Sequence, residues 1–375
     1  MRGNWEGQAA DAAREGRATA LQTADWRHRP GATPAGAARP RRAAVRPATT
    51  ITDQLHLGAR KGDAAKERER AREIVAAGKT AVTEAFVAIR AGQPIPLREL
   101  SPIVEAIAAS VARDAAAMPG VTRLKERHEY TYLHSVAVCG LMIGLAHELQ
   151  LDPALIPDIG LAGLLHDIGK ARVPNLLLDK PGPLTDEEFA VVRTHTARGH
   201  ELLQQAGVES PIALDVCLHH HERPDGRGYP ERLFEDEVSL YARMGAVCDV
   251  YDAITSARAY KKSWTPGETL DWMAETKGQF DRKILTAFGA VIGPLPLGTL
   301  VRLASDRLAL VVEDCAARRA PTVVAFHCAQ ADRALPLRVV DTRLDAITSV
   351  ERAARWHFAD WDTTKSAAFG FYTDE

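Results

Sequence analysis

The chain has 375 residues, of which 46% are hydrophobic and 26% charged, and its formal net charge is −2. These values are typical of a globular protein with one large domain or two smaller ones. A net charge this close to zero excludes a general attraction to nucleic acid or to a membrane surface, so any anion chemistry must come from a local cluster. No run of about 18 apolar residues is present, which argues against a membrane span.

Residues 1–60 are rich in Ala, Arg, Gly and Pro, and the stretch 34–47 offers almost nothing to bury. Such a segment cannot offset its own ordering entropy, so we predict a disordered tail. It has no apolar region of the kind found in secretory signals. The five cysteines of the chain are scattered and form no CxxC pair, which favours a reducing compartment. We therefore predict a cytoplasmic location.

The pattern of residues 61–120 predicts two helices. Apolar residues recur at three- and four-residue steps from Ile74 to Phe86 and again from Ile103 to Val111, and prolines separate the two stretches. We predict a helical accessory segment, which either packs on the main domain or pairs two subunits in a homodimer.

Almost every segment of residues 121–292 has helical periodicity, which predicts an all-helical domain. The character changes after Gly293. Short stretches rich in Val and Leu, separated by turn residues, predict a small β-module over 293–350. Residues 351–375 are expected to form a C-terminal tail. The fold class predicted from the sequence is therefore mainly α, with a small C-terminal β-module and a disordered N-terminal tail.

Histidines and aspartates recur in or beside the predicted helices of residues 121–292, each with apolar neighbours. They are His134, His166, Asp167, His195, His219, His220, His221, Asp249 and Asp252. One isolated histidine in such a context is most often a satisfied core residue, but a whole set of imidazoles and carboxylates in one domain needs another explanation, because buried polar groups require partners. Mixed imidazole and carboxylate ligands suit divalent Fe, Mn or Zn, and the absence of Cys argues against a structural zinc. The number of ligands favours two ions, with Asp167 placed to bridge them.

Three cations accompany this set. Lys170 follows Asp167 by three residues, so both should project from one helical face, and Arg258 and Lys261 are likewise three apart. Metal ions flanked by Lys and Arg are typical of a phosphate-ester site, although each cation alone could equally be a solvated surface charge. The turn-rich loop 221–230 directly after the histidines is a candidate lip of the site, with Tyr229 able to stack on a base.

The chain resembles the HD-GYP family of HD phosphohydrolases over about residues 127–290. The motifs that carry the resemblance are His166-Asp167-Ile-Gly-Lys170, His220-His221-Glu222, Gly228-Tyr229-Pro230 and Asp249-Val-Tyr-Asp252. The resemblance implies an all-helical HD-type catalytic domain over 121–292 that hydrolyses cyclic di-GMP to linear pGpG or GMP, with Fe or Mn as cofactors.

Carried over by position, the resemblance also assigns roles to residues. The implied metal ligands are His134, His166, Asp167, His195, His220, His221 and Asp249. The implied catalytic residues are Asp167, Lys170 and Asp252, and the implied substrate contacts are Lys170, Asp252, Arg258, Lys261 and Tyr229. Some members complete a third metal site with a Glu four residues before the first ligand, where this chain has Tyr130, so two ions are expected. His219 receives no role.

The mechanism expected from these residues is attack on phosphorus by a hydroxide that bridges the two metal ions. Two alternatives remain open at this stage. The chain could be a signalling module that binds cyclic di-GMP or a protein partner, through the Gly228-Tyr229-Pro230 loop, but turns substrate over slowly. It could also be an HD phosphohydrolase that acts on another nucleotide. Binding to nucleic acid is not expected, because no basic stripe with interleaved aromatics is present.

Overall fold

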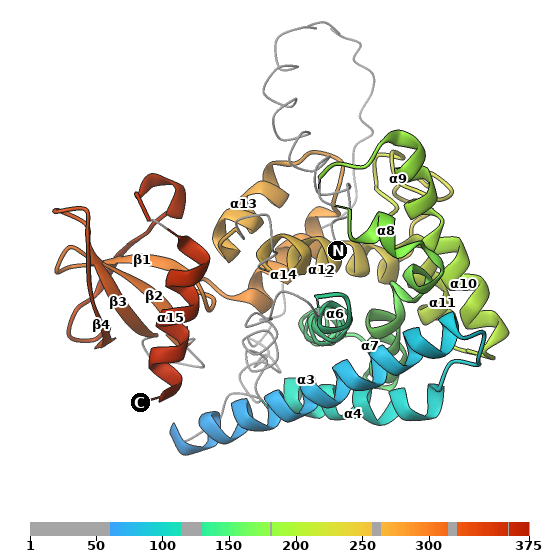
Figure 1. The fold of residues 1–375 in the computed structure, drawn as a ribbon, viewed down its shortest axis with the longest axis horizontal. Helices are drawn as coiled ribbons and strands as arrows, with labels where there is room; N and C mark the ends of the chain where they lie inside the picture. Colours follow the sequence, from blue (N-terminus) through green and yellow to red (C-terminus); the bar gives the residue numbers. More distant parts are fainter. Residues whose placement is uncertain are drawn as a thin grey trace, which may run out of the picture.

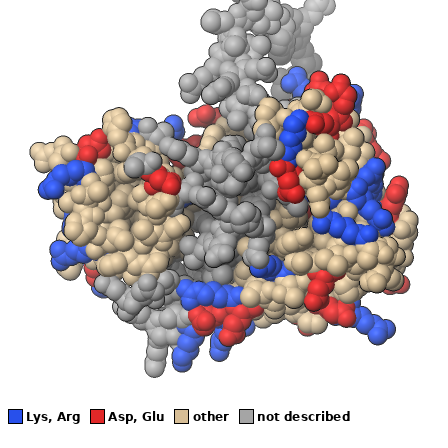
Figure 2. All heavy atoms as spheres, in the orientation of Figure 1, with Lys and Arg blue, Asp and Glu red and all other residues tan. Residues whose placement is uncertain are grey.

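The computed structural model describes residues 61–113, 130–180, 182–256, 264–313, 321–358 and 360–374. Within these residues the chain forms a helical domain and, beside it, a small antiparallel sheet covered by the C-terminal helix (Figure 1). The prediction of a mainly α fold with a C-terminal β-module is confirmed. The predicted tail over residues 1–60 lies outside the described residues. Both signs of charge are interspersed over the helical domain on the face drawn in Figure 2, in keeping with the near-neutral net charge.

The helical domain is built around one apolar helix. Helix α6 (Tyr130–Glu148) buries side chains all round its circumference, including Val136, Met142 and Leu145, which is the pattern of a helix enclosed by others. Figure 1 shows it end-on at the centre of the domain. The helices in contact with it are α3 (Lys61–Arg90), α4 (Leu97–Arg113), α7 (Ile156–Leu165), α12 (Leu240–Thr255) and α14 (Arg282–Ile292).

Helices α3 and α4 confirm the two helical stretches expected before the main domain. The break between them contains Pro94 and Pro96. These residues account for the break, because proline removes a backbone donor and disfavours a helical residue before it. Val82, Phe86 and Ile107 are buried in the same core as α6, so this segment packs on the main domain. Between the two helices, the buried carboxylate of Glu67 accepts hydrogen bonds from Ser110 and Arg113.

Seven short helices complete the helical domain within the described residues. They are η1 (Pro153–Leu155), η2 (Ile168–Arg172), α8 (Asn175–Leu178), α9 (Asp186–Arg193), α10 (His195–Gln205), α11 (Pro211–His219) and α13 (Pro266–Glu275). Thr185 and Thr265 begin α9 and α13 with capping boxes, and Ser239 caps α12.

The expected continuous helix through His166 and Asp167 is wrong. Helix α7 ends at Leu165, and the chain turns into the 3-10 helix η2 after Asp167. Gly169 explains the turn, because a Cβ at this position would lie 1.9 Å from the carbonyl oxygen of His195 and 2.5 Å from the amide nitrogen of Gly199. Only glycine lets η2 approach the backbone of α10 this closely. The approach brings Asp167 next to His195.

The β-module is a five-stranded antiparallel sheet in the order β4-β3-β2-β1-β5. Its strands are β1 (Leu300–Leu303), β2 (Arg307–Glu313), β3 (Thr322–Cys328), β4 (Arg333–Asp341) and β5 (Ile347–Val350). Alternate side chains bury on opposite faces, as the pleat of a β-strand requires. Leu310 and Phe326 face one apolar cluster, while Val311 and Ala325 face the other. The short strand β5 was not predicted.

The C-terminal segment differs from the expected tail. After the 3-10 turn η3 (Ala353–Arg355), helix α15 (Trp361–Asp374) packs on β2 and β3. Trp361 is 3% exposed, stacks on Phe358 with ring centroids 5.2 Å apart and contacts Phe326. The aromatic residues of 356–372 supply one side of a sheet core, so these residues belong to the β-module.

Two further expectations concern the chain as a whole. None of the helices within the described residues is long and apolar enough to cross a membrane. Cys139, Cys217, Cys248 and Cys328 are free thiols, as predicted, and Cys315 lies outside the described residues.

We predict that Trp361→Ala destabilises the β-module by about 3–5 kcal/mol, because it removes a large buried side chain from a small core. The measurement is the midpoint and slope of the urea unfolding transition followed by circular dichroism. Leu344→Ala is the control, since Leu344 is 89% exposed and its loss should change stability by less than about 0.5 kcal/mol. Equal effects of the two substitutions would contradict the packing role of α15.

Candidate metal centre

The structure brings together side chains that are far apart in the sequence. His134 comes from the first turn of α6, His166 and Asp167 from the α7–η2 junction, and His195 from the start of α10. His220 and His221 directly follow α11, and Asp249 and Asp252 lie on α12. All are buried or nearly so, and most of their side chains are less than 4% exposed. The predicted ligands therefore share one interior site.

Backbone carbonyls fix the orientation of three of the imidazoles. His166, His195 and His220 each place Nδ1 2.8 to 2.9 Å from a carbonyl oxygen three or four residues earlier in the chain. Because a carbonyl can only accept, Nδ1 carries the proton and Nε2 presents a lone pair. Each of these histidines stands at a helix end, where such a carbonyl is available.

His134 is oriented by carboxylates. Its Nδ1 lies 2.7 Å from Oδ2 of Asp252, and its Nε2 lies 2.9 Å from Oδ1 of Asp249. Asp252 therefore contacts the ring nitrogen that faces away from Asp249. This contact fixes the ring and the tautomer of His134. The catalytic and substrate-binding role expected for Asp252 stays a prediction.

Asp167 lies between two groups of potential metal ligands. One group is His134, His166 and Asp167, and the other is Asp167, His195, His220 and His221. Within each group the ligand atoms lie within 4.8 Å of one another. The two oxygens of Asp167 point to different groups, since Oδ2 is 3.3 Å from Nε2 of His166 and Oδ1 is 3.3 Å from Nε2 of His195. Asp249 adjoins the first group, with Oδ1 3.8 Å from Nε2 of His166.

The unpaired lone pairs and carboxylate oxygens of the site favour the binding of cations. Among the described residues, the Nε2 atoms of His166, His195 and His220 have no hydrogen-bond partner, and neither does one oxygen each of Asp167 and Asp249, although all are buried. Lone pairs of imidazole thus face carboxylate oxygens, an arrangement that is unfavourable unless a proton or a metal ion lies between them. The residues fit divalent metal ions, because these donors are buried, converge and are held in the ligating tautomer.

The pKa values follow from the same crowding. Burial acts to raise the pKa of Asp167, but Lys170, His166 and His195 hold it well below its usual range. Burial acts to lower the pKa of His166, but Asp167 and Asp249 raise it to about 10, so without a metal ion a proton on Nε2 would take the place of the cation. Burial and the neighbouring imidazoles lower the pKa of His220 to about 3. The negative charge of the carboxylates is therefore held in the centre at neutral pH.

Lys170 lies where the sequence predicted, beside Asp167. Its Nζ is 2.5 Å from Oδ2 of Asp167, and its side chain is 13% exposed. The local structure is a 3-10 turn rather than the expected α-helix, yet the three-residue spacing still places both groups together. Arg258 and Lys261, the other two predicted cations, lie outside the described residues.

The loop after His221 is anchored by Glu222. This carboxylate is 1% exposed and accepts hydrogen bonds from the backbone amides of Glu231, Arg232 and Leu233, at 2.6 to 3.1 Å. Gly228 packs directly on the same residue, since a Cβ there would lie 2.4 Å from Cα of Glu222. The loop is thus held against the end of the His220-His221 segment.

Tyr229 packs over His221, one of the predicted metal ligands. Its ring lies over His221 with centroids 4.7 Å apart and planes inclined by 30°, and its hydroxyl group is buried. It also packs against the apolar cluster formed by α8, α9 and their flanks, including Phe189. The ring that the sequence suggested for base stacking is therefore engaged with His221 on one face.

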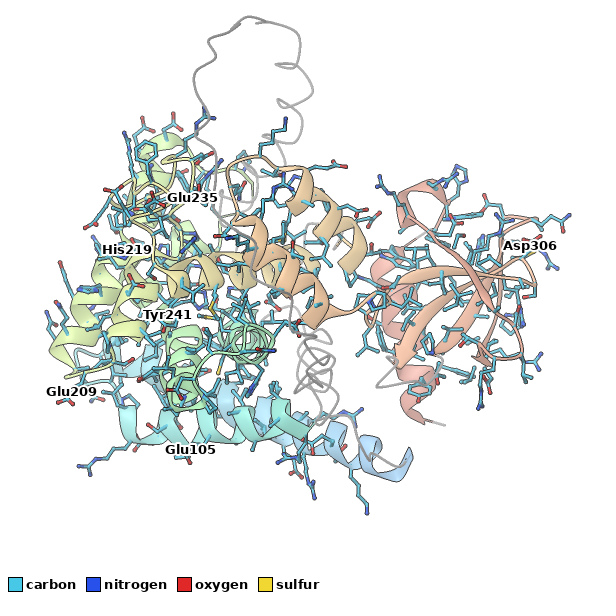
Figure 3. All side chains as sticks on the ribbon, turned by 180° about the vertical axis from the view of Figure 1, so that it is seen from behind. Glu105, Glu209, His219, Glu235, Tyr241 and Asp306 are labelled. Carbon is cyan, nitrogen blue, oxygen red and sulfur yellow. The ribbon has the colours of Figure 1, made fainter. Side chains whose placement is uncertain are left out.

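His219, to which the sequence gave no role, tethers α11 to its surroundings. Its Nδ1 lies 2.8 Å from Asp215, its Nε2 lies 3.4 Å from Glu231, and Asp215 also bonds to Ser239 at the start of α12. Figure 3 shows His219 on the flank of the domain that also carries Glu235 and Tyr241. The four-residue spacing of Asp215 and His219 was the signal in the sequence that could have indicated this pair.

Comparison with known proteins agrees with this geometry. A profile of the HD domain family matches residues 113–284. The cyclic di-GMP phosphodiesterase PA4108 of Pseudomonas aeruginosa is 44% identical over 345 residues, which cover 89% of this chain and 83% of that protein. The chain belongs to the HD-GYP family. The His166-Asp167, His220-His221, Gly228-Tyr229-Pro230 and Asp249-Val-Tyr-Asp252 motifs lie within the residues that the profile matches.

Other relatives match a shorter part of the chain. The cyclic di-GMP phosphodiesterase response regulator RpfG of Xanthomonas campestris is 39% identical over 154 residues, or 40% of this chain and 39% of that protein. The 3'3'-cGAMP-specific phosphodiesterase 2 of Vibrio cholerae is 35% identical over 143 residues, or 38% of this chain and 27% of that protein.

We predict that Gly228→Ala destabilises the protein by about 1–3 kcal/mol and lowers activity, because the new methyl group would meet the backbone of Glu222 and Arg223. Thermal unfolding and phosphodiesterase assays provide the measurement. Gly267→Ala is the matched control, because nothing lies within 4 Å of a Cβ built at this position. Alanine in α13 should raise the free energy of unfolding by up to about 1 kcal/mol. A neutral Gly228→Ala would refute the proposed packing of the loop.

Proposed function

We propose that this HD-GYP protein is a metal-dependent phosphodiesterase that hydrolyses cyclic di-GMP to linear pGpG, GMP or both. The observation that carries the proposal is the carboxylate of Asp167, shared by two groups of buried ligands whose histidines present their lone pairs inward. The similarity to PA4108, named a cyclic di-GMP phosphodiesterase, covers most of the chain and supports this substrate.

The cofactors that we propose are two divalent ions, Fe or Mn. His134, His166 and Asp249 would hold one, His195, His220 and His221 the other, and Asp167 both. Such ions lower the pKa of a water molecule and neutralise charge on a bound phosphate. The donor set of imidazoles and carboxylates without thiolates supports Fe or Mn in preference to a structural zinc.

The residues of the chain would then orient the substrate, and none of them would need to act as a nucleophile. Lys170, already beside Asp167, would bind a phosphodiester oxygen, as would Arg258 and Lys261. Asp252 would keep His134 in position. Burial and the nearby Asp167 raise the pKa of Cys217, so this thiol stays neutral and does not act as a nucleophile. Hydrolysis by water, with no covalent intermediate on the protein, follows from these roles.

A second candidate substrate is another cyclic dinucleotide, because relatives with comparable identity over the HD-GYP domain are named 3'3'-cGAMP-specific phosphodiesterases. The greater coverage and identity of PA4108 favour cyclic di-GMP. The complete ligand set weighs against a module that only binds the nucleotide, since binding alone does not require seven converging ligands.

The partners and the division of the chain are further parts of the proposal. We assign the catalytic domain to residues 121–292, the accessory segment to 61–120 and the β-module to 293–374. A homodimer would form through the accessory segment. A signalling protein would bind at the Gly228-Tyr229-Pro230 loop, where the neighbouring Phe234 is 63% exposed.

The test of the function is turnover of cyclic di-GMP by protein purified without air and loaded with Fe or Mn, followed by chromatography. We expect linear pGpG or GMP to appear, and Asp167→Ala to abolish the reaction. Hydrolysis of bis(p-nitrophenyl) phosphate without hydrolysis of cyclic di-GMP would refute the proposal that cyclic di-GMP is the substrate. It would not contradict the proposed metal centre.

The number of ions is tested by metal analysis of variants. We expect two ions per chain in the native protein, none in Asp167→Ala and one in His134→Ala, because Asp167 alone belongs to both ligand groups. His219→Ala is the control, since this adjacent histidine points to Asp215 and should leave both ions bound. Loss of both ions in His134→Ala would contradict the division into two groups.

A further inference from the structure

Arg193 occupies a position at the candidate site to which no role has been given. It is the last residue of α9 and stands two residues before the ligand His195. Its side chain is half-buried, and its guanidinium carbon lies 5.0 Å from the ring centroid of Phe189 and 5.9 Å from that of Tyr229. Phe189 is on the same helix, but Tyr229 comes from the loop that covers His221.

The guanidinium group of Arg193 has no acceptor. Within the described residues, neither a hydrogen bond nor an ion pair engages it, and only the two aromatic rings hold it. Two other half-buried arginines of the domain are paired: Arg223 binds Asp225 through two nitrogens, and Arg243 binds Asp281. Stacking on a ring uses the face of a guanidinium and leaves its five in-plane N–H donors available.

The location links this cation to the metal centre. The Tyr229 ring lies 4.7 Å from the ring of His221 and 6.4 Å from that of His195. Arg193 is thus separated from two proposed ligands by a single aromatic ring. The proposed ions and Lys170 already provide for the phosphodiester, so a substrate bound there would extend its bases or sugars toward the surrounding side chains.

We propose that Arg193 recognises a guanine base of the substrate, an inference that rests on the proposed function. A planar guanidinium with free in-plane donors is complementary to the O6 and N7 acceptors of guanine. Adenine carries an amino donor in place of O6, so its edge would meet the same guanidinium donor to donor. Arg193 thereby selects guanine over adenine, while the metal centre supplies the reaction.

The experiment compares Arg193→Gln and Arg193→Lys with the native protein, all loaded with metal. It measures kcat/KM for cyclic di-GMP, the inhibition constant of cyclic di-AMP, and the rate with bis(p-nitrophenyl) phosphate, which has no base. We expect both variants to lose about 10- to 100-fold in kcat/KM for cyclic di-GMP, mainly through KM. Binding of cyclic di-AMP should be unchanged or tighter. The bis(p-nitrophenyl) phosphate rate and the metal content should stay within about twofold of the native values.

Arg198→Gln is the matched control, because this arginine on α10 donates only to the backbone carbonyl of Arg172 and should behave as the native protein. Unchanged kinetics with cyclic di-GMP in Arg193→Gln would overturn the proposal. So would an equal loss with cyclic di-AMP, which would indicate phosphate binding, or full activity of Arg193→Lys, which would indicate that charge alone suffices. If the metal-loaded native protein hydrolyses bis(p-nitrophenyl) phosphate but neither hydrolyses nor binds cyclic di-GMP, the proposed function itself is overturned.

Discussion

The burial of two carboxylates, Asp167 and Asp249, among imidazoles is the constraint on which the rest of the helical domain depends. Both side chains are 1% exposed, and a charge removed from water is costly unless it is paired. Helices and helix ends from five segments of the domain meet around the two carboxylates and supply the groups that pair with them. Lys170 and His134 contact the carboxylates directly, and the remaining histidines surround them. The arrangement of α6, α7, α10, α11 and α12 thus follows from the need to neutralise the centre.

Helix ends do much of this positioning. His166, His195 and His220 stand at or beside helix termini, where carbonyl oxygens three or four residues earlier accept their Nδ1 protons. The same local contact therefore aims each ring and selects its tautomer. Close backbone approaches then bring the ends together, most clearly at Gly169. Short-range backbone contacts thus orient three of the imidazoles of the centre.

The sequence predicted the types of element and the residues of the candidate site. It was less informative about how the backbone turns and which distant residues come into contact. Helical periodicity and the short Val- and Leu-rich stretches after Gly293 predicted the fold class, and the contexts of the histidines predicted which side chains converge. The turn after Asp167 was missed because Gly169 has meaning only beside the backbone of α10, which is distant in sequence. The contact of Asp252 with His134, 118 residues away, was also not indicated by any local pattern. The packing of α15 depends on a partner sheet that local pattern does not reveal, and the contacts of Arg193 with Tyr229 are likewise non-local.

The separation of the ligands along the chain has a consequence for biosynthesis. His134 and Asp249 meet across 115 residues, and Asp167 needs both groups of histidines around it. A growing polypeptide therefore possesses no complete centre until α12 has left the ribosome, and isolated pairs such as His220-His221 offer a passing metal ion only weak, partial chelation. Tight binding arises only in the finished fold, so metal uptake draws the folding equilibrium toward completion. Maturation of the protein and acquisition of its ions would then be a single cooperative event.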